Sequence, residues 1–211
     1  MSLPITICVK CSVCGIESEQ KVLVSTNAFG SPDLDLRPPE MQRSTMKWWI
    51  QECPHCGYVS TSIEDETNIS IEYLNSYEYC TCSNNSFKSE LAEKFYKYYK
   101  INLSDNNEED AFYAILHAAW SCDDIGDTDN AIYCRKLAIA EIEKIIENND
   151  NETLKVQKAD LFRRAGLFDA LIENYNPLDF EDEILQKIIS FQIQKSIEKD
   201  SSVYTVANAI G

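Results

Sequence analysis

The sequence contains no run of the roughly 18 to 20 apolar residues that a membrane-spanning helix needs. Its start, Met1 to Lys10, lacks the charged, apolar and small-residue zones of a secretory signal. Apolar residues nevertheless make up 44% of the 211-residue chain, which is enough to bury a core. We therefore expect a globular, cytoplasmic protein with no membrane partner.

Basic residues are also scarce, because 19 Lys and Arg stand against 35 Asp and Glu and give a net charge of −16. Residues 1–60 carry five basic and six acidic residues, whereas residues 61–211 carry 14 and 29. An acidic surface repels phosphate backbones, because nucleic-acid affinity depends on basic groups that displace counterions. Nucleic acid is therefore a disfavoured partner. The acidity serves solubility or, as the alternative, forms a face for a basic partner.

Cysteine, in contrast, is abundant, and four of the nine cysteines follow a repeated spacing. Cys11 and Cys14 form one C-x-x-C pair, and Cys53 and Cys56 form another. The odd cysteine count, the absent signal and the paired spacing favour thiolates that hold a metal over disulfides. Zn²⁺ prefers four such ligands in a tetrahedron, and a shell closed by four cysteines leaves no position for water. We expect a structural zinc site.

A glycine directly follows the second cysteine of each pair, Gly15 in one and Gly57 in the other. A residue without a side chain allows the backbone to fold back with positive φ, so that its amides point toward the sulfurs. This detail selects the pairs, because a Cys8/Cys11 knuckle would place Ser12 at the glycine position. Cys8 is therefore expected on the incoming strand.

The site resembles a zinc ribbon, or rubredoxin, whose second knuckle commonly reads C-P-x-C-G, as Cys53 through Gly57 do. The resemblance covers the first 60 residues and implies zinc or, as the alternative, an iron used for electron transfer. The 38 residues between Cys14 and Cys53 exceed what most ribbons use.

The remaining cysteines have plainer interpretations. Cys80 and Cys82 form a C-x-C that we interpret as ordinary thiols near a helix end, with a second metal site shared with Cys8 as the alternative. Cys122 and Cys134 are expected in the core. Of the two histidines, His55 is expected at the surface of the knuckle and His117 in the core or at its boundary.

Hydrophobic periodicity divides the chain into two parts. Residues 5–14 and 19–25 are rich in Val, Ile and Thr and predict short strands, and a further strand is predicted to begin at Trp48. Past residue 68 the period changes from two to about 3.6 residues. Helices are predicted over these ranges: residues 69–79, 89–99, 105–126, 127–146, 152–165 and 181–199. Asp105 is the expected cap of the third helix. The last helix is expected to bury six apolar residues: Ile184, Leu185, Ile188, Ile189, Ile193 and Ile197.

Residues 27–46 contain three prolines and a glycine and are predicted to form a long loop. Loops of this length in compact domains are often functional. One hypothesis is a clamp, in which Arg37 and Arg43 find acidic partners on the helical part. The alternative is ligand recognition at a cleft between the two parts. The candidate residues are Asp33, Asp35, Arg37, Glu40 and Arg43.

Residues 111–146 resemble a tetratricopeptide repeat through the turn at Gly126 and the small residues Ala131 and Ala138, which lie where paired helices approach closely. The whole chain resembles uncharacterised bacterial proteins that join a ribbon of paired C-x-x-C-G knuckles to tetratricopeptide-like helices. That resemblance implies a fold rather than a task.

We therefore expect an α+β protein, with a small β zinc ribbon over residues 1–63 and an all-α tetratricopeptide-like domain over residues 64–211. The leading hypothesis is a non-catalytic intracellular adaptor for a protein or peptide, since helical pairs create grooves and no nucleophile with a base or phosphate loop is visible. A nucleic-acid-associated ribbon and a rubredoxin-like iron carrier are the alternatives.

Overall fold

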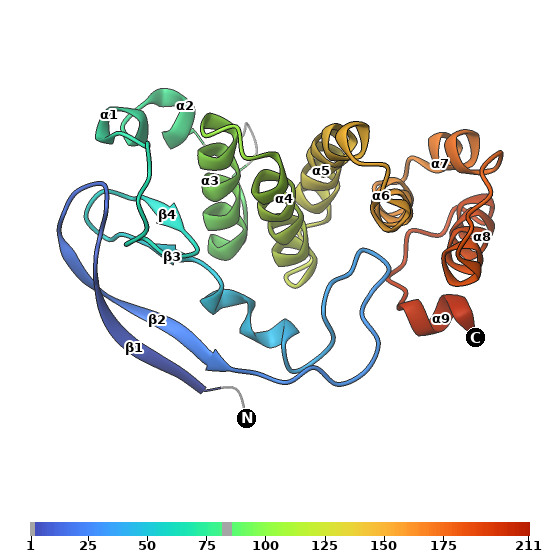
Figure 1. The fold of residues 1–211 in the computed structure, drawn as a ribbon, viewed down its shortest axis with the longest axis horizontal. Coiled ribbons are helices and arrows are strands. Elements are labelled where there is room, and N and C mark those ends of the chain that lie inside the picture. The colour runs from blue at the N-terminus through green and yellow to red at the C-terminus, as the bar shows by residue number, and fades with distance from the viewer. Residues whose placement is uncertain (1–2, 82–85) are drawn as a thin grey trace.

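The computed structural model describes residues 3–81 and 86–211, and it has an α+β architecture (Figure 1). A small N-terminal sheet comes first, and a row of helices follows. This order confirms the expected fold class at the level of strands before helices.

The N-terminal part contains two separate two-stranded sheets. Strand β1 (Leu3–Lys10) pairs antiparallel with β2 (Glu17–Ser25), and the first cysteine pair lies in the turn between them. Strands β3 (Gln51–Glu52) and β4 (Val59–Ser60) pair antiparallel around the second cysteine pair. Each knuckle is therefore the turn of a hairpin.

The segment before the second hairpin differs from the prediction at Trp48. Residues 26–42, called the loop below, lead into the 3-10 helix η1 (Arg43–Trp48), so the predicted strand begins only at Gln51. Two side chains hold this turn, because Met46 is buried and the indole of Trp49 donates to Thr45 Oγ1 at 2.9 Å.

The helix expected over residues 69–79 is two short helices, α1 (Ile71–Leu74) and α2 (Tyr77–Cys80). The break arises because Asn75 donates through its side chain to the carbonyl of Ile71, while Ser76 accepts from the amide of Tyr79. Polar caps thus override the apolar periodicity.

The larger helices stand in a row, and each one packs against the next along the chain (Figure 1). Their bounds are α3 (Glu90–Ser104), α4 (Glu108–Asp123), α5 (Thr128–Asn148), α6 (Glu152–Arg164), α7 (Phe168–Tyr175) and α8 (Glu183–Ile197). Small buried residues on α4 and α5, such as Ala119 and Ala138, allow these two helices to approach closely.

Two details of the helical prediction are wrong. Asn107 caps α4 by accepting from the amide of Asp110, whereas Asp105 ends α3. On α8, the predicted burial of Ile188 and Ile189 is confirmed, whereas Ile184 and Ile197 at the two ends of the helix are 52% and 60% exposed.

The C-terminal segment returns to the loop. Helix α9 (Val206–Ile210) begins with a capping box at Thr205, and Thr205 also forms an isolated β-bridge with Asp33. In Figure 1 the loop runs beneath the ends of the central helices toward α9. Among the described residues, none of the helices combines the length and apolar character that crossing a bilayer requires.

Candidate functional site

The sulfur atoms of Cys11, Cys14, Cys53 and Cys56 all lie within 4.8 Å of one another. The Sγ atoms of Cys11 and Cys56 are 3.7 Å apart, and those of Cys14 and Cys53 are 3.6 Å apart. A tetrahedron with metal–sulfur bonds of about 2.3 Å has edges of about 3.8 Å. Four thiols that the sequence separates into two pairs are thus brought to the spacing of a tetrahedral metal site, as expected.

The two knuckles have the same backbone pattern. The amide of Cys11 donates to Ile16 O at 3.0 Å and that of Gly15 to Cys11 O at 2.9 Å. In the second knuckle the amide of Cys53 donates to Tyr58 O at 2.8 Å, and that of Gly57 donates to Cys53 O at 2.9 Å.

Both knuckle glycines adopt the left-handed conformation, with φ of 72° at Gly15 and 73° at Gly57. This conformation is unfavourable for residues with a Cβ. The glycine after each second cysteine therefore has the local role that the sequence suggested.

The thiols differ in their electrostatic surroundings. Burial raises the pKa of Cys11 and of Cys56, although backbone amides oppose this effect. The backbone amide of Ile16 lowers the pKa of Cys14. Amides directed at sulfur stabilise the thiolate form, which is the form that binds a metal.

Further contacts hold the knuckles in place. The amide of Ser12 donates to Ile63 O at 2.9 Å, and the amide of Ile63 donates to the Gln51 side chain at 3.0 Å. From α2, the hydroxyl of Tyr79 donates to Gly57 O at 2.7 Å. The first knuckle is therefore attached to the segment after the second hairpin, and the second knuckle is attached to helix α2.

Within residues 3–81 and 86–211, the four knuckle cysteines form the one group of three or more close Cys, His or acidic ligands. Cys8 and Cys80 are exposed, and Cys82 lies outside the described residues. His55 is exposed, whereas Cys122 and Cys134 are fully buried.

The loop residues singled out by the sequence form ionic contacts rather than one cluster around a ligand. Arg37, 4% exposed, binds Asp124 just after α4 with both carboxylate oxygens at 2.7 Å from Nη2. The clamp hypothesis expected Arg43 to find an acidic partner on the helical part, but Arg43 pairs at 2.7 Å with Asp33, which belongs to the loop. Glu40 accepts from Ser44.

Asp35 is the most deeply inserted loop residue and has no exposed surface. Its Oδ2 accepts from the Trp120 indole at 2.7 Å and from Arg164 Nη1 at 3.1 Å. Its carbonyl accepts from the side chain of Gln157 at 2.8 Å. Burial raises the pKa of Asp33, against the opposing effect of Arg43. The loop is thus joined to α4 and α6 through hydrogen bonds to buried groups.

A buried arginine cluster surrounds this junction, and the sequence reasoning missed it. Arg164 also binds Asp123 at 2.6 Å, Arg135 from α5 binds the same carboxylate, and Arg163 binds Asp160 at 2.5 Å. Burial disfavours the charge on Asp123, but the two arginines hold its pKa below the ordinary value. We name as the buried arginine cluster the following residues: Asp35, Arg37, Asp123, Asp124, Arg135, Asp160, Arg163 and Arg164.

The cluster contains four acidic and four basic side chains, so its charges balance, which is the condition under which buried charges are tolerated. The signal in the sequence was the spacing of Asp160 and Arg163, three residues apart on a helix whose other buried residues are mostly apolar.

Between the loop and helices α4 and α6 lies an open cleft of about 470 Å³, which we call the loop cleft. The loop contributes three prolines, and aromatic rings come from Trp49, which directly follows η1, and from helix α4. The residues used below are Leu36, Gln42, Trp49, Tyr113, His117 and Trp120. The loop therefore has features of both hypotheses, because an ion pair fixes it to the helical region and its residues also form one wall of a cleft.

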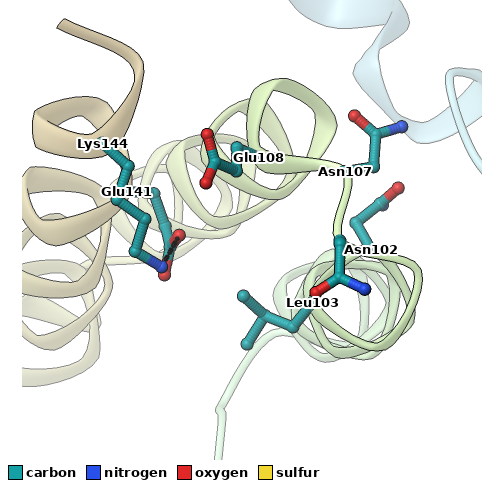
Figure 2. A pocket seen from close by; sticks show the side chains of 7 residues that line it. Asn102, Leu103, Asn107, Glu108, Glu141 and Lys144 are labelled. Carbon is teal, nitrogen blue, oxygen red and sulfur yellow. Dashed lines mark hydrogen bonds and ion pairs between the residues drawn. The ribbon is translucent and has the colours of Figure 1, made fainter. Parts of the chain in front are cut away.

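A second, smaller cavity of about 90 Å³ lies between the end of α3, the start of α4 and the side of α5 (Figure 2). Glu141 lines it and is already bonded to the hydroxyl of Tyr99 at 3.0 Å and to Lys144 at 2.6 Å. This volume is well below the roughly 300 Å³ at which small-molecule sites begin, so the loop cleft is the stronger candidate for binding.

No protein-family model matches the chain, and searches of curated proteins and of solved structures find no match either. The likeness to zinc ribbons and tetratricopeptide repeats therefore depends on the residues and geometry described above.

Proposed function

We propose that this protein is a non-catalytic intracellular adaptor that is stabilised by zinc and binds a peptide segment of a partner protein in the loop cleft. The observation that carries the proposal is the cleft itself, because the loop and Trp49, which precede the second knuckle, build it together with helices α4 and α6. An open cleft of about 470 Å³ lies within the size range of binding sites.

Zinc is the metal we assign to the four cysteines. The sulfur separations of 3.6 and 3.7 Å fit a four-thiolate shell, and such a shell is filled by protein ligands alone. In this assignment Cys11, Cys14, Cys53 and Cys56 hold the metal, and the metal orders the two hairpins. Iron bound by the same thiolates is the alternative, and it would give a coloured protein.

The order of packing supports a tetratricopeptide-like helical region. Each helix from α3 to α8 packs on its successor, and the turn at Gly126 between α4 and α5 has a φ of 71°. Rows of paired helices form extended surfaces that suit peptide binding. Free thiolates suit a reducing compartment, which supports an intracellular location.

A selection from a random peptide display library, carried out on the zinc-loaded protein, tests the adaptor function. We expect enriched peptides that bind the parent protein and the Tyr77→Ala variant, whose substitution is in α2 outside the cleft. The same peptides should lose binding to Tyr113→Ala, because Tyr113 lines the cleft. If no peptide is enriched, or if every enriched peptide binds both variants equally, the proposal is wrong.

A further inference from the structure

Among the residues that the structure describes, those lining the loop cleft include no charged side chain, although the chain as a whole has a net charge of −16. The charged residues of the loop have partners elsewhere: Arg37 binds Asp124, and Asp33 binds Arg43. A charged ligand would therefore lose hydration in the cleft without gaining an opposite charge from its walls. This arrangement selects an uncharged ligand.

His117, which also lines the cleft, does not change this conclusion. Its imidazole lies among four aromatic rings with centroids 4.8 to 6.3 Å away: Trp49, Phe95, Tyr113 and Trp120. Burial, together with the positive charge of Arg37, lowers the pKa of His117 to about 3. The ring is therefore neutral near pH 7 and offers one donor and one acceptor.

The aromatic walls are held rigidly. The indole of Trp49 donates to Thr45 at 2.9 Å, and that of Trp120 donates to Asp35 at 2.7 Å. Both polar indole edges are therefore already bonded, and the rings offer the ligand apolar surface. Leu36 adds a further apolar wall, and it remains 41% exposed although its φ of 65° is unfavourable for a residue with a Cβ.

Hydrogen-bonding groups complete the lining. The hydroxyl of Tyr113 and the amide of Gln42 are donors on residues that line the cleft. Gln157 also lines the cleft, but its side chain is buried and its amide nitrogen already donates to Asp35 O at 2.8 Å. The donors of Tyr113 and Gln42 therefore match a segment rich in carbonyl acceptors.

From these observations we propose that the loop cleft binds an uncharged, extended segment of a partner protein that contains several prolines. This inference rests on the proposed adaptor function and names its ligand class. A proline-rich segment forms a polyproline II helix without internal hydrogen bonds, exposes its carbonyls, and docks in grooves lined by aromatic rings.

The probe for this inference is a short proline–leucine peptide, acetylated and amidated so that it carries no charge. Titration followed by tryptophan fluorescence uses Trp49 and Trp120, which line the cleft. We expect saturable binding to the full zinc-loaded protein and a Kd raised about tenfold or more in Tyr113→Ala, the effect of losing about 1.4 kcal/mol of contact. Tyr77→Ala, whose residue is 84% exposed elsewhere, is the matched control and should keep the parent Kd.

A second variant keeps the test valid if Tyr113→Ala does not fold. Leu36→Asn removes the apolar wall while asparagine tolerates the left-handed backbone at that position, so we expect a higher Kd without loss of thermal stability. Gln42→Glu and Gln42→Lys place opposite charges in the cleft lining, and both should weaken binding of the neutral probe.

The inference is overturned if the probe does not bind, if it binds Tyr113→Ala and Leu36→Asn as it binds the parent, or if versions with lysine or glutamate in place of leucine bind more tightly. Library peptides that need Tyr113 but are charged or lack proline would overturn the ligand class and leave the adaptor function standing. Absence of any peptide that needs Tyr113 would remove the adaptor function itself.

Discussion

The hairpin region over residues 3–63 and the helical region over residues 90–197 differ in what fills their interiors. Strand β1 leaves Leu3 and Ile5 60% and 48% exposed, and its one buried residue is Val9, which is 5% exposed. Helix α4 instead buries a continuous set of apolar residues, including Phe112, Ile115 and Cys122 at 0% exposure. The hairpin region contributes few apolar side chains to the buried core that it shares with the helices, and the helical region contributes most of them.

This difference indicates two sources of stability. Apolar burial contributes about 25 cal/mol per Å² and increases with the number of buried side chains, so the helices have their own driving force. The hairpin region has only about 60 residues in total and gains little stability from apolar burial. The four thiols between its hairpins are the place where a bound metal would add to the free energy of folding.

The loop connects the hairpin region to the helical region through ion pairs and hydrogen bonds. Asp35 reaches Trp120 and Arg164 from 85 and 129 residues away in the sequence. These contacts belong to neither hairpins nor helices alone. The stability of the loop should therefore respond to loss of a charge rather than to loss of the metal.

The largest effect is expected from removing two of the four ligands. In Cys53→Ser/Cys56→Ser, zinc should be lost and the hairpins should unfold, because structural zinc contributes about 10 to 16 kcal/mol of binding free energy in small modules. The helices should keep most of their signal. Metal analysis and far-ultraviolet circular dichroism measure both effects. An unchanged zinc content would remove the metal assignment, and a collapse of the helical signal would remove the contrast between the regions.

The next largest effect concerns the contact between loop and helices. Arg37→Ala should lower the free energy of unfolding by about 1 to 2 kcal/mol, because the Asp124 carboxylate that loses its partner is 51% exposed and stays hydrated. Arg43→Ala should cost about 3 kcal/mol, because it leaves the Asp33 carboxylate, whose side chain is 4% exposed, buried without its ionic partner. Urea unfolding measures both. An Arg37→Ala midpoint that matches the parent would contradict a clamp through Arg37, and an Arg43→Ala midpoint that matches the parent would show that Asp33 does not depend on Arg43.

A pH-dependent effect is expected at His117, where the pKa is lowered to about 3 from 6.5. Below about pH 6.5 the unfolded chain binds a proton that the folded chain does not bind until about pH 3, so the folded state loses stability as the pH falls through this window. His117→Phe removes this contribution. The difference in unfolding free energy between parent and variant should change by about 1.4 kcal/mol per pH unit between about pH 6 and 4. A difference that stays constant with pH would show that His117 is not held neutral.

The smallest effect uses two glycines with the same backbone geometry. Gly57 and Gly126 have φ of 73° and 71°, and an added Cβ would meet no atom within 4 Å at either position. Alanine at each should therefore cost about 1 to 2 kcal/mol through backbone strain alone. Gly57→Ala should lower zinc affinity, whereas Gly126→Ala should lower helical stability and leave zinc affinity unchanged. Competition with a zinc chelator and thermal melts separate the two. An equal loss of zinc affinity in both variants would contradict the claim that the metal stabilises the hairpin region and not the helices.

The sequence predicted those features whose determinants lie close together in the chain. The knuckles follow from cysteines three residues apart with a glycine next, and helices α5 and α6 follow from periodicity and from the asparagines between them. The break between α1 and α2 was missed, because the capping of Asn75 and Ser76 outweighed an apolar pattern.

The loop cleft and the buried arginine cluster were not predictable in the same way. Arg164 is an ordinary residue of a helical pattern until it is known to meet Asp35 and Asp123. Likewise, nothing in the chain near Leu36 indicates that Tyr113 and Trp120 lie across a cleft from it. Such features depend on long-range packing, which periodicity does not encode.

The most direct test of the difference between the two regions is hydrogen–deuterium exchange of the zinc-loaded protein with and without a chelator. Our account predicts that chelation removes the protection of amides in the knuckles, such as those of Cys11 and Cys53, whereas amides within α4 and α5 keep theirs. Knuckle amides that stay protected without metal, or helical amides that lose protection together with them, would contradict it.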